Sequence, residues 1–207
     1  PITLAISQPN ILVVHPSVKA ASVSELIDLA HARPGKLKYA SGVIGSSSQL
    51  AAALFAYMAD IDIVGIPYKD SVLPGVSDLI AGKLQLMIFS AGSGMEHVKA
   101  GRLRALAVTS TEPTVLAPGL PTVAATLPGY ESVHVQGVYA PAHTPAPIID
   151  RLNREIVQVL NTAEVKKQLL SAGIEAIGTT PEVLAATVKA ESARLATLIK
   201  RLGINAG

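Results

Sequence analysis

The chain has 207 residues, of which 49% are hydrophobic and 15% charged, and this composition excludes an intrinsically disordered chain. A formal net charge of +2 and an aromatic content of 3% disfavour a nucleic-acid surface, and the absence of Cys excludes disulfides and thiolate metal sites. A chain of this length forms one domain or two small lobes.

Strand and helix signals alternate over residues 11–109. An apolar run that Pro16 ends predicts the first strand, and Ser22-Val23-Ser24-Glu25 is a capping box that begins a helix. Further strands are predicted at residues 37–41, 61–67, 84–89 and 103–109, and helices at 22–33, 47–59, 71–81 and 95–100. Such alternation favours a mostly parallel sheet with helices on both faces.

The second part of the chain has a different character. Residues 110–129 are rich in proline and predict a surface loop with one helical turn near 122–127, followed by a strand at 132–139. Three helices are predicted at 148–160, 163–172 and 181–202, with one weak strand at 174–177. The apolar positions of the first helix, Leu152, Ile156 and Leu160, need a sheet to cover. We therefore expect residues 142–207 to pack on a partner chain or to be poorly ordered.

The first residues resemble neither a signal peptide nor a membrane anchor. Pro1-Ile2-Thr3-Leu4 has no starting Met, no basic segment and no small-residue cleavage site, so we expect the chain to begin inside a longer one or to have been processed. A membrane span needs about 18 consecutive apolar residues, and the apolar runs here have the length of strands.

A glycine- and serine-rich segment joins the predicted strand at 37–41 to the helix at 47–59. Two glycines allow close approach to the backbone, and a serine triplet begins the helix, whose free N–H groups favour an anion. The candidate anion-binding residues are Ser41, Gly42, Gly45, Ser46, Ser47 and Ser48. The alternative is an ordinary turn with an N-cap serine, since the segment matches neither a Walker loop nor a dinucleotide fingerprint.

Two other strand ends carry polar residues. Tyr68 and Lys69 follow one strand and could reach a ligand at the carboxyl edge of the sheet, or could lie in a solvated loop. Ser90 begins a stretch of small residues, Ser90-Ala91-Gly92-Ser93-Gly94, which is either a second wall of the same site or a flexible connector.

Catalytic and metal-binding patterns are not found in the sequence. The five His residues are scattered without metal-ligand spacing, no nucleophile elbow occurs, and no two carboxylates are placed for acid–base chemistry. We therefore expect no metal, no cofactor and no enzymatic activity.

Several segments, in order and spacing, resemble the Bug-type (TctC-type) solute-binding proteins of tripartite tricarboxylate transporters. Typical motifs are Leu12-Val13-Val14-His15-Pro16, Gly45-Ser46-Ser47-Ser48 and Ile66-Pro67-Tyr68-Lys69. The other similar segments are residues 33–41, 80–87, 97–109, 121–123, 128–130 and 140–145.

The resemblance implies a type II periplasmic-binding-protein fold whose two α/β lobes close on a small carboxylate. Residues 17–136 would form a complete lobe, residues 1–16 and 142–207 would belong to the second lobe, and the chain would cross near 14–17 and 137–142. The function implied is a periplasmic receptor that binds its ligand in the cleft between lobes and delivers it to membrane transporter subunits. Tyr68 and Ser90 would join the serine loop at the ligand.

The sequence departs from the family pattern in three places. The family's amino-terminal third, with its signal peptide, is not in this chain, and an incomplete lobe would favour self-association. Ser90 stands where the family often has an acidic residue, and Asp70 stands where it usually has Gly.

Two other functions remain open. An effector-binding domain of a transcription regulator shares the bilobed fold and has a similar length. A small hydrolase that uses Ser46 or Ser47 is a weaker alternative, because the sequence offers no candidate general base.

Overall fold

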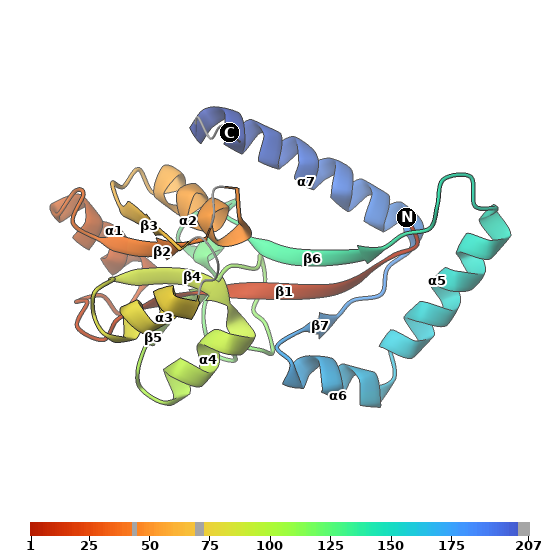
Figure 1. The fold of residues 1–207 in the computed structure, drawn as a ribbon, viewed down its shortest axis with the longest axis horizontal. Helices are drawn as coiled ribbons and strands as arrows, with labels where there is room; N and C mark the ends of the chain where they lie inside the picture. Colours follow the sequence, from red (N-terminus) through yellow and green to blue (C-terminus); the bar gives the residue numbers. More distant parts are fainter. Residues whose placement is uncertain (43–44, 69–72, 203–207) are drawn as a thin grey trace. The chain divides into compact units, whose positions relative to one another are not determined.

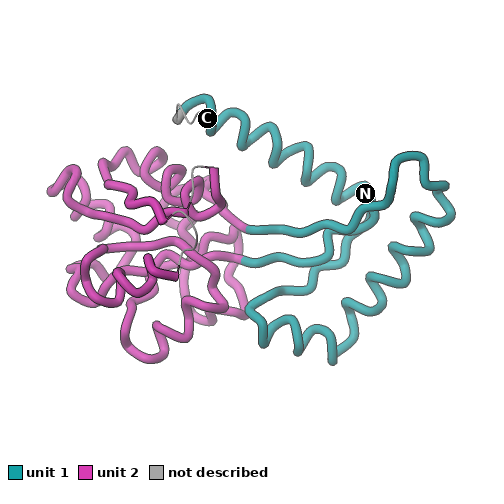
Figure 2. The backbone as a smooth tube through the Cα atoms, in the orientation of Figure 1, with its two compact units in different colours: residues 1–8, 134–201 teal, residues 9–133, 202–207 magenta. Residues whose placement is uncertain are grey.

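The computed structural model describes residues 1–42, 45–68 and 73–202 and divides into two compact units (Figures 1 and 2). Unit 1 comprises residues 1–8 and 134–201, and unit 2 comprises residues 9–133 and 202–207. The chain therefore passes between the units after Gln8 and after Val133. The assignment of residues 17–136 to one ligand-binding lobe stays a prediction.

Unit 2 contains a mixed, mostly parallel sheet with the strand order β3-β2-β4-β1-β5. The strands are β1 (Thr3–Val14), β2 (Lys38–Ser41), β3 (Val64–Pro67), β4 (Leu86–Ser90) and β5 (Arg104–Val108). β2 runs parallel to β3 and β4, whereas β1 runs antiparallel to β4 and β5. Four strands therefore share one direction, and the predicted fold class is confirmed.

Helices of unit 2 follow the strands in alternation (Figure 1). They are α1 (Val23–Ala32), α2 (Ser47–Met58), α3 (Leu73–Ile80), α4 (Ala91–Lys99) and the 3-10 turn η1 (Val123–Ala125). The predicted capping box is confirmed, because Ser22 Oγ accepts from the Glu25 N–H at 3.2 Å. The Glu25 carboxylate accepts from the N–H of Ala21, one residue before the N-cap.

The two faces of the sheet each carry a hydrophobic core cluster. Leu12 and Val14 of β1 lie in one cluster with residues of α1 and α2, whereas Ile11 and Val13 lie in the other with residues of α3 and α4. The side chains of β4 alternate between the clusters in the same way. A strand that is buried on both faces has an uninterrupted apolar sequence, which is why β1 and β4 were readily predicted.

Two predicted element starts differ from the structure by at least four residues. β1 begins at Thr3 instead of residue 11, because Ser7-Gln8-Pro9-Asn10 interrupts its apolar sequence and its first half is held by pairing with distant segments. α4 begins at Ala91 instead of residue 95, although Gly92 and Gly94 suggested a connector. Gly94 serves packing, since a Cβ on it would lie 2.5 Å from Ile11 Cδ1. Glycine therefore lets α4 lie close to β1.

Unit 1 is built on the first residues of β1. Its elements are β6 (Val133–Val138), α5 (Ala146–Leu160), α6 (Ala163–Ser171), β7 (Glu175–Ala176) and α7 (Pro181–Leu202), and both strands pair with β1. Thr3 and Thr179 join the strand ends through reciprocal hydrogen bonds, and the Asn153 amide donates to the carbonyls of Ile2 and Thr179. In the described part of the chain, no helix is both long and apolar enough to span a bilayer.

Candidate carboxylate-binding site

The carboxyl ends of three neighbouring parallel strands bring the predicted site residues to one edge of unit 2. Ser41 ends β2, Ser90 ends β4, and Tyr68 follows β3, which pairs with β2 on its other side. Parallel strands end at the same edge of a sheet, so these three positions share that edge. The topology therefore brings together candidates that are up to 49 positions apart in the sequence.

The glycine- and serine-rich segment lies at this edge, between β2 and α2. Ser46 is the N-cap of α2, and its Oγ accepts from the Gln49 N–H at 3.4 Å. Ser46 Oγ also lies 3.3 Å from Ser48 Oγ, so the two hydroxyls are hydrogen-bonded to each other. The intervening Val43 and Ile44 lie outside the described residues. The predicted start of the helix at Ser47 is confirmed.

Both glycines of the segment are needed for its backbone geometry. Gly45 has φ +82°, in the left-handed region that side chains other than glycine rarely adopt. A Cβ on Gly42 would lie 2.5 Å from Ser46 Oγ and 3.1 Å from Ser48 Oγ. The backbone at Gly42 therefore approaches the serine hydroxyls more closely than any side chain allows.

The two glycine amides already donate to oxygen atoms of α2. The Gly42 N–H donates to Ser48 Oγ at 3.1 Å, and the Gly45 N–H donates to Gln49 Oε1 at 3.2 Å. The N–H groups of Ser47 and Ser48 have no acceptor among the described residues. The segment is thus a cluster of amide and hydroxyl donors. Two of its amide N–H groups, those of Gly42 and Gly45, already donate to neutral side-chain oxygens.

Gln49 is a residue of this cluster that we did not predict. A signal for it was present, because Ser46 and Gln49 have the Ser-x-x-Gln spacing of a capping box. In the structure the Gln49 side chain reaches the N–H of Gly45, one residue before the N-cap. The same one-residue shift occurs at Glu25 in α1, so it is a property of both helix starts.

Ser90 is the N-cap of α4, directly opposite Asn10 of β1. Its side chain makes no capping hydrogen bond within α4, all of which is described, and it is only partly buried. The Ser90 hydroxyl is therefore placed at the sheet edge without a role in capping its helix.

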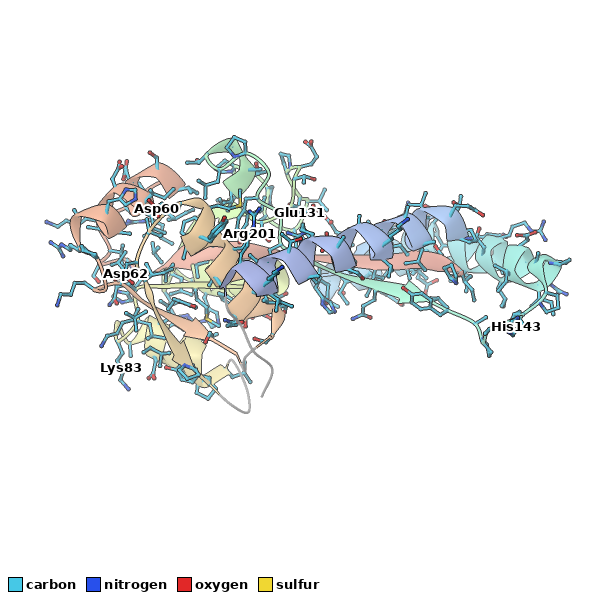
Figure 3. The ribbon with its side chains drawn as sticks, turned by 90° about the horizontal axis from the view of Figure 1, so that it is seen from above. Asp60, Asp62, Lys83, Glu131, His143 and Arg201 are labelled. Atoms are coloured by element: carbon cyan, nitrogen blue, oxygen red, sulfur yellow. The ribbon has the colours of Figure 1, made fainter. Side chains whose placement is uncertain are left out.

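The hydroxyl of Tyr68 is engaged within unit 2. It donates to Asp78 Oδ2 at 2.7 Å, while Asp78 Oδ1 accepts from Lys83 Nζ at 2.8 Å; Lys83 is labelled in Figure 3. Burial, together with the hydrogen bond and charge of Asp78, raises the pKa of Tyr68 to about 12. Hydrogen bonds from Lys83 and Tyr68 lower the pKa of Asp78.

The contact with Asp78 holds the Tyr68 ring in place at the sheet edge. A Cβ on Gly75 would lie 3.2 Å from the Tyr68 ring, so the ring packs closely on α3. Asp78 was not predicted, since no local pattern connects it to Tyr68. Lys69 and Asp70, which the sequence also indicated, lie outside the described residues.

Residues 1–204 match the family described as tripartite tricarboxylate transporter family receptor. The chain belongs to this family. The family and the homologues are solute-binding receptors, not enzymes, as the residues predicted. The described residues contain no group of three or more His, Asp or Glu residues that could hold a metal ion.

Individual relatives of this receptor family show how far the likeness extends. The chain is 39% identical over 208 residues to the UPF0065 protein in the tcbD-tcbE intergenic region of Pseudomonas sp. strain P51, covering 100% of this chain and 62% of that protein. The structure of Rpa4515 from R. palustris with adipate is 33% identical with a TM-score of 0.83, covering 99% of this chain and 68% of that one. The periplasmic binding protein BugD is 25% identical with a TM-score of 0.79, covering 99% and 69%.

These likenesses confirm the periplasmic-binding-protein fold. The chain spans about 62% of the length of the curated relatives that it matches over nearly all of its own residues.

Proposed function

We propose that the protein is a periplasmic receptor that binds a small carboxylate at the carboxyl edge of the unit 2 sheet. We also propose that it delivers this ligand to a tripartite tricarboxylate-type membrane transporter. Family membership supports the receptor role, and the adipate of the Rpa4515 structure supports a dicarboxylate as ligand. The periplasmic description of BugD supports the location.

The observation that carries the proposal is the donor cluster between Gly42 and Gln49. An anionic oxygen is a stronger acceptor for an N–H group than a neutral hydroxyl or amide oxygen. A carboxylate therefore competes for the Gly42 and Gly45 amides, replacing Ser48 Oγ and Gln49 Oε1. The partial positive charge at the start of α2 favours the same exchange.

Calorimetric titration with adipate and succinate tests this site. Ser46→Ala removes a hydroxyl from the cluster, and we expect an affinity loss of about tenfold to a hundredfold, since a hydrogen bond to a charged group contributes about 1.5–3 kcal/mol. Ser22→Ala is the matched control, because it removes the N-cap hydroxyl of α1, away from the strand ends of the site. Both variants lose about 0.5–2 kcal/mol of stability, but only Ser46→Ala should bind more weakly.

A second variant pair tests the exchange of acceptors. Gln49→Glu places a carboxylate within reach of the Gly45 N–H, so we expect it to compete with the ligand and weaken binding by at least about tenfold. Gln49→Ala removes the neutral acceptor and should bind adipate at least as tightly as the unmodified chain. Binding that none of the Ser46 and Gln49 variants changes would show that this segment is only a turn.

A further inference from the structure

A separate cavity lies at the other end of the unit 2 sheet. It has a volume of about 250 Å³ and is lined by Ser17, Val18, Lys19, Leu29, Arg33, Leu37 and Gln85. Leu37 and Gln85 directly precede β2 and β4, whereas Ser41 and Ser90 end these strands. The cavity is therefore distinct from the proposed carboxylate site, and its existence is independent of the proposed function.

The lining of this cavity has positive charge and no negative charge. Lys19 and Arg33 both face it, and no carboxylate is among the lining residues. Within the described part of the chain, neither cation forms an ion pair, whereas Lys83 and Arg194 pair with Asp78 and Glu191. Two cations thus share one concave surface without a counter-charge.

Hydrogen bonds hold the backbone that carries both cations. The Arg104 guanidinium donates to the carbonyls of Val18 and Ala20, at 3.3 and 3.1 Å, on either side of Lys19. Arg33 is the C-cap of α1, where its N–H donates to the Ala30 carbonyl. Hydrogen bonds therefore hold the backbone at the base of both side chains.

Two other polar side chains, those of Gln85 and Ser17, line the cavity, and only Gln85 has a donor without a partner among the described residues. Gln85 Oε1 accepts from the Lys38 N–H at 2.9 Å, which fixes the side-chain amide and leaves its NH₂ group as a donor. His15 Nδ1 accepts from the Ser17 N–H and lies 2.7 Å from Ser17 Oγ, so the Ser17 hydroxyl is already engaged. Lys19, Arg33 and Gln85 are the donors that remain.

We propose that this cavity is a second anion site, which binds a phosphate-sized oxyanion through Lys19, Arg33 and Gln85. The planar guanidinium of Arg33 matches two oxygens of such a group, and Lys19 supplies a second charge. The volume lies below the range of about 300–1,000 Å³ that is usual for sites of larger organic ligands, so the occupant is a small ionic group. Free phosphate and the phosphate of an anionic lipid headgroup have the same chemistry.

Nuclear magnetic resonance titration of the chain with inorganic phosphate tests the site. We expect saturable shifts of the Lys19 and Arg33 amides and of the Gln85 NH₂ group. The double variant Lys19→Ala/Arg33→Ala should bind phosphate at least about tenfold more weakly. Arg33→Lys should lose part of the affinity, because a lysine ammonium lacks the planar pair of donors with which the guanidinium binds two oxygens. The matched control Lys166→Ala/Lys167→Ala removes the same charge from exposed positions of α6 in unit 1 and should change affinity by less than about twofold.

Sedimentation with lipid vesicles distinguishes the two sources of phosphate. Binding to phosphatidylglycerol but not phosphatidylcholine vesicles, lost in the Lys19/Arg33 variant and reversed by phosphate, identifies a lipid headgroup. Phosphate binding without vesicle binding identifies a free anion. Equal losses in the double variant and its control would overturn the proposal, as would the absence of binding to both phosphate and anionic vesicles.

Discussion

The two units of this protein use amphipathic helices with different results. Helix α1 of unit 2 buries Val23, Leu26 and Ala30, because it lies on one face of a sheet that has helices on both faces. Helix α5 of unit 1 has an equally clear apolar stripe, and none of its residues is buried. Ile148, Leu152 and Val159 are exposed to 49%, 38% and 55%. An apolar stripe thus predicts a helix, but its burial depends on a second layer.

The largest expected effect comes from the same substitution in these two helices. Leu26 is fully buried in α1, so Leu26→Ala should destabilise the protein by about 2–5 kcal/mol through lost burial and a cavity. Leu152→Ala in α5 should cost less than about 1 kcal/mol, since its side chain is already partly in water. Urea unfolding measures the stability of both variants, and similar losses of stability would show that the two helices do not differ in burial as described.

The buried threonines provide a polar version of this comparison. Thr109 of unit 2 donates to the Ser132 carbonyl at 2.6 Å and accepts from the Asn10 N–H. Thr3 of unit 1 donates to the Thr179 carbonyl and accepts from the Thr179 N–H, both at 2.8 Å. Valine at either position leaves partly buried partners without their hydrogen bonds, so each should cost about 1–3 kcal/mol.

Thr109→Ser and Thr3→Ser are the controls for these changes, since both keep the hydroxyl. Equal losses for the two valine variants in chemical unfolding would show that hydrogen bonds stabilise unit 1 where apolar burial is small. A negligible loss for Thr3→Val would contradict that interpretation.

The exposed apolar face of α5 is a second difference between the two units. We expect residues 142–207 to pack on a partner chain or to be cut readily by proteases, because a wide apolar surface favours association. Leu152→Glu should reduce the concentration-dependent mass measured by light scattering, whereas the control Leu73→Glu, at an exposed position of unit 2, should not. A compact, protease-resistant monomer would contradict this prediction.

The smallest effect concerns pH and is confined to unit 2. The pKa of Tyr68 is raised from 10.0 to about 12, so above pH 10 the unfolded chain loses this proton before the folded chain does. The contribution of Tyr68 to stability is therefore complete below pH 10 and declines as the pH rises from 10 to about 12. Tyr68→Phe should remove this part of the decline in unfolding measurements, and an unchanged pH profile would argue against the Asp78 contact.

Much of unit 2 could be predicted from its sequence, because local signals there agree with burial. The capping serines Ser22 and Ser46 begin helices at the expected positions, and the apolar runs of β1 and β4 mark the centre of the sheet. The glycine- and serine-rich segment was predicted as an anion site on the same local grounds. The structure explains why both positions are glycine. Gly45 has a positive φ, and the backbone at Gly42 lies too close to the serine hydroxyls for a side chain.

Other features depended on contacts between residues that are far apart in the chain. The first half of β1 is separated from the apolar run of its second half by Ser7-Gln8-Pro9-Asn10, and it pairs with the distant strands β6 and β7. Tyr68 was predicted as a ligand contact, and its hydroxyl donates to Asp78, ten residues later, in a contact that no local motif specifies.

Most of the helices and strands, the family and the donor-rich segment follow from the sequence alone, since capping, periodicity and contiguous motifs specify each of them. The folded geometry sets which of these donors already have an acceptor, because the side chains of Ser48 and Gln49 reach the amides of Gly42 and Gly45. It likewise decided which apolar stripes are buried. Burial depends on the layer that covers a helix, and a helix's own sequence contains no information about that layer.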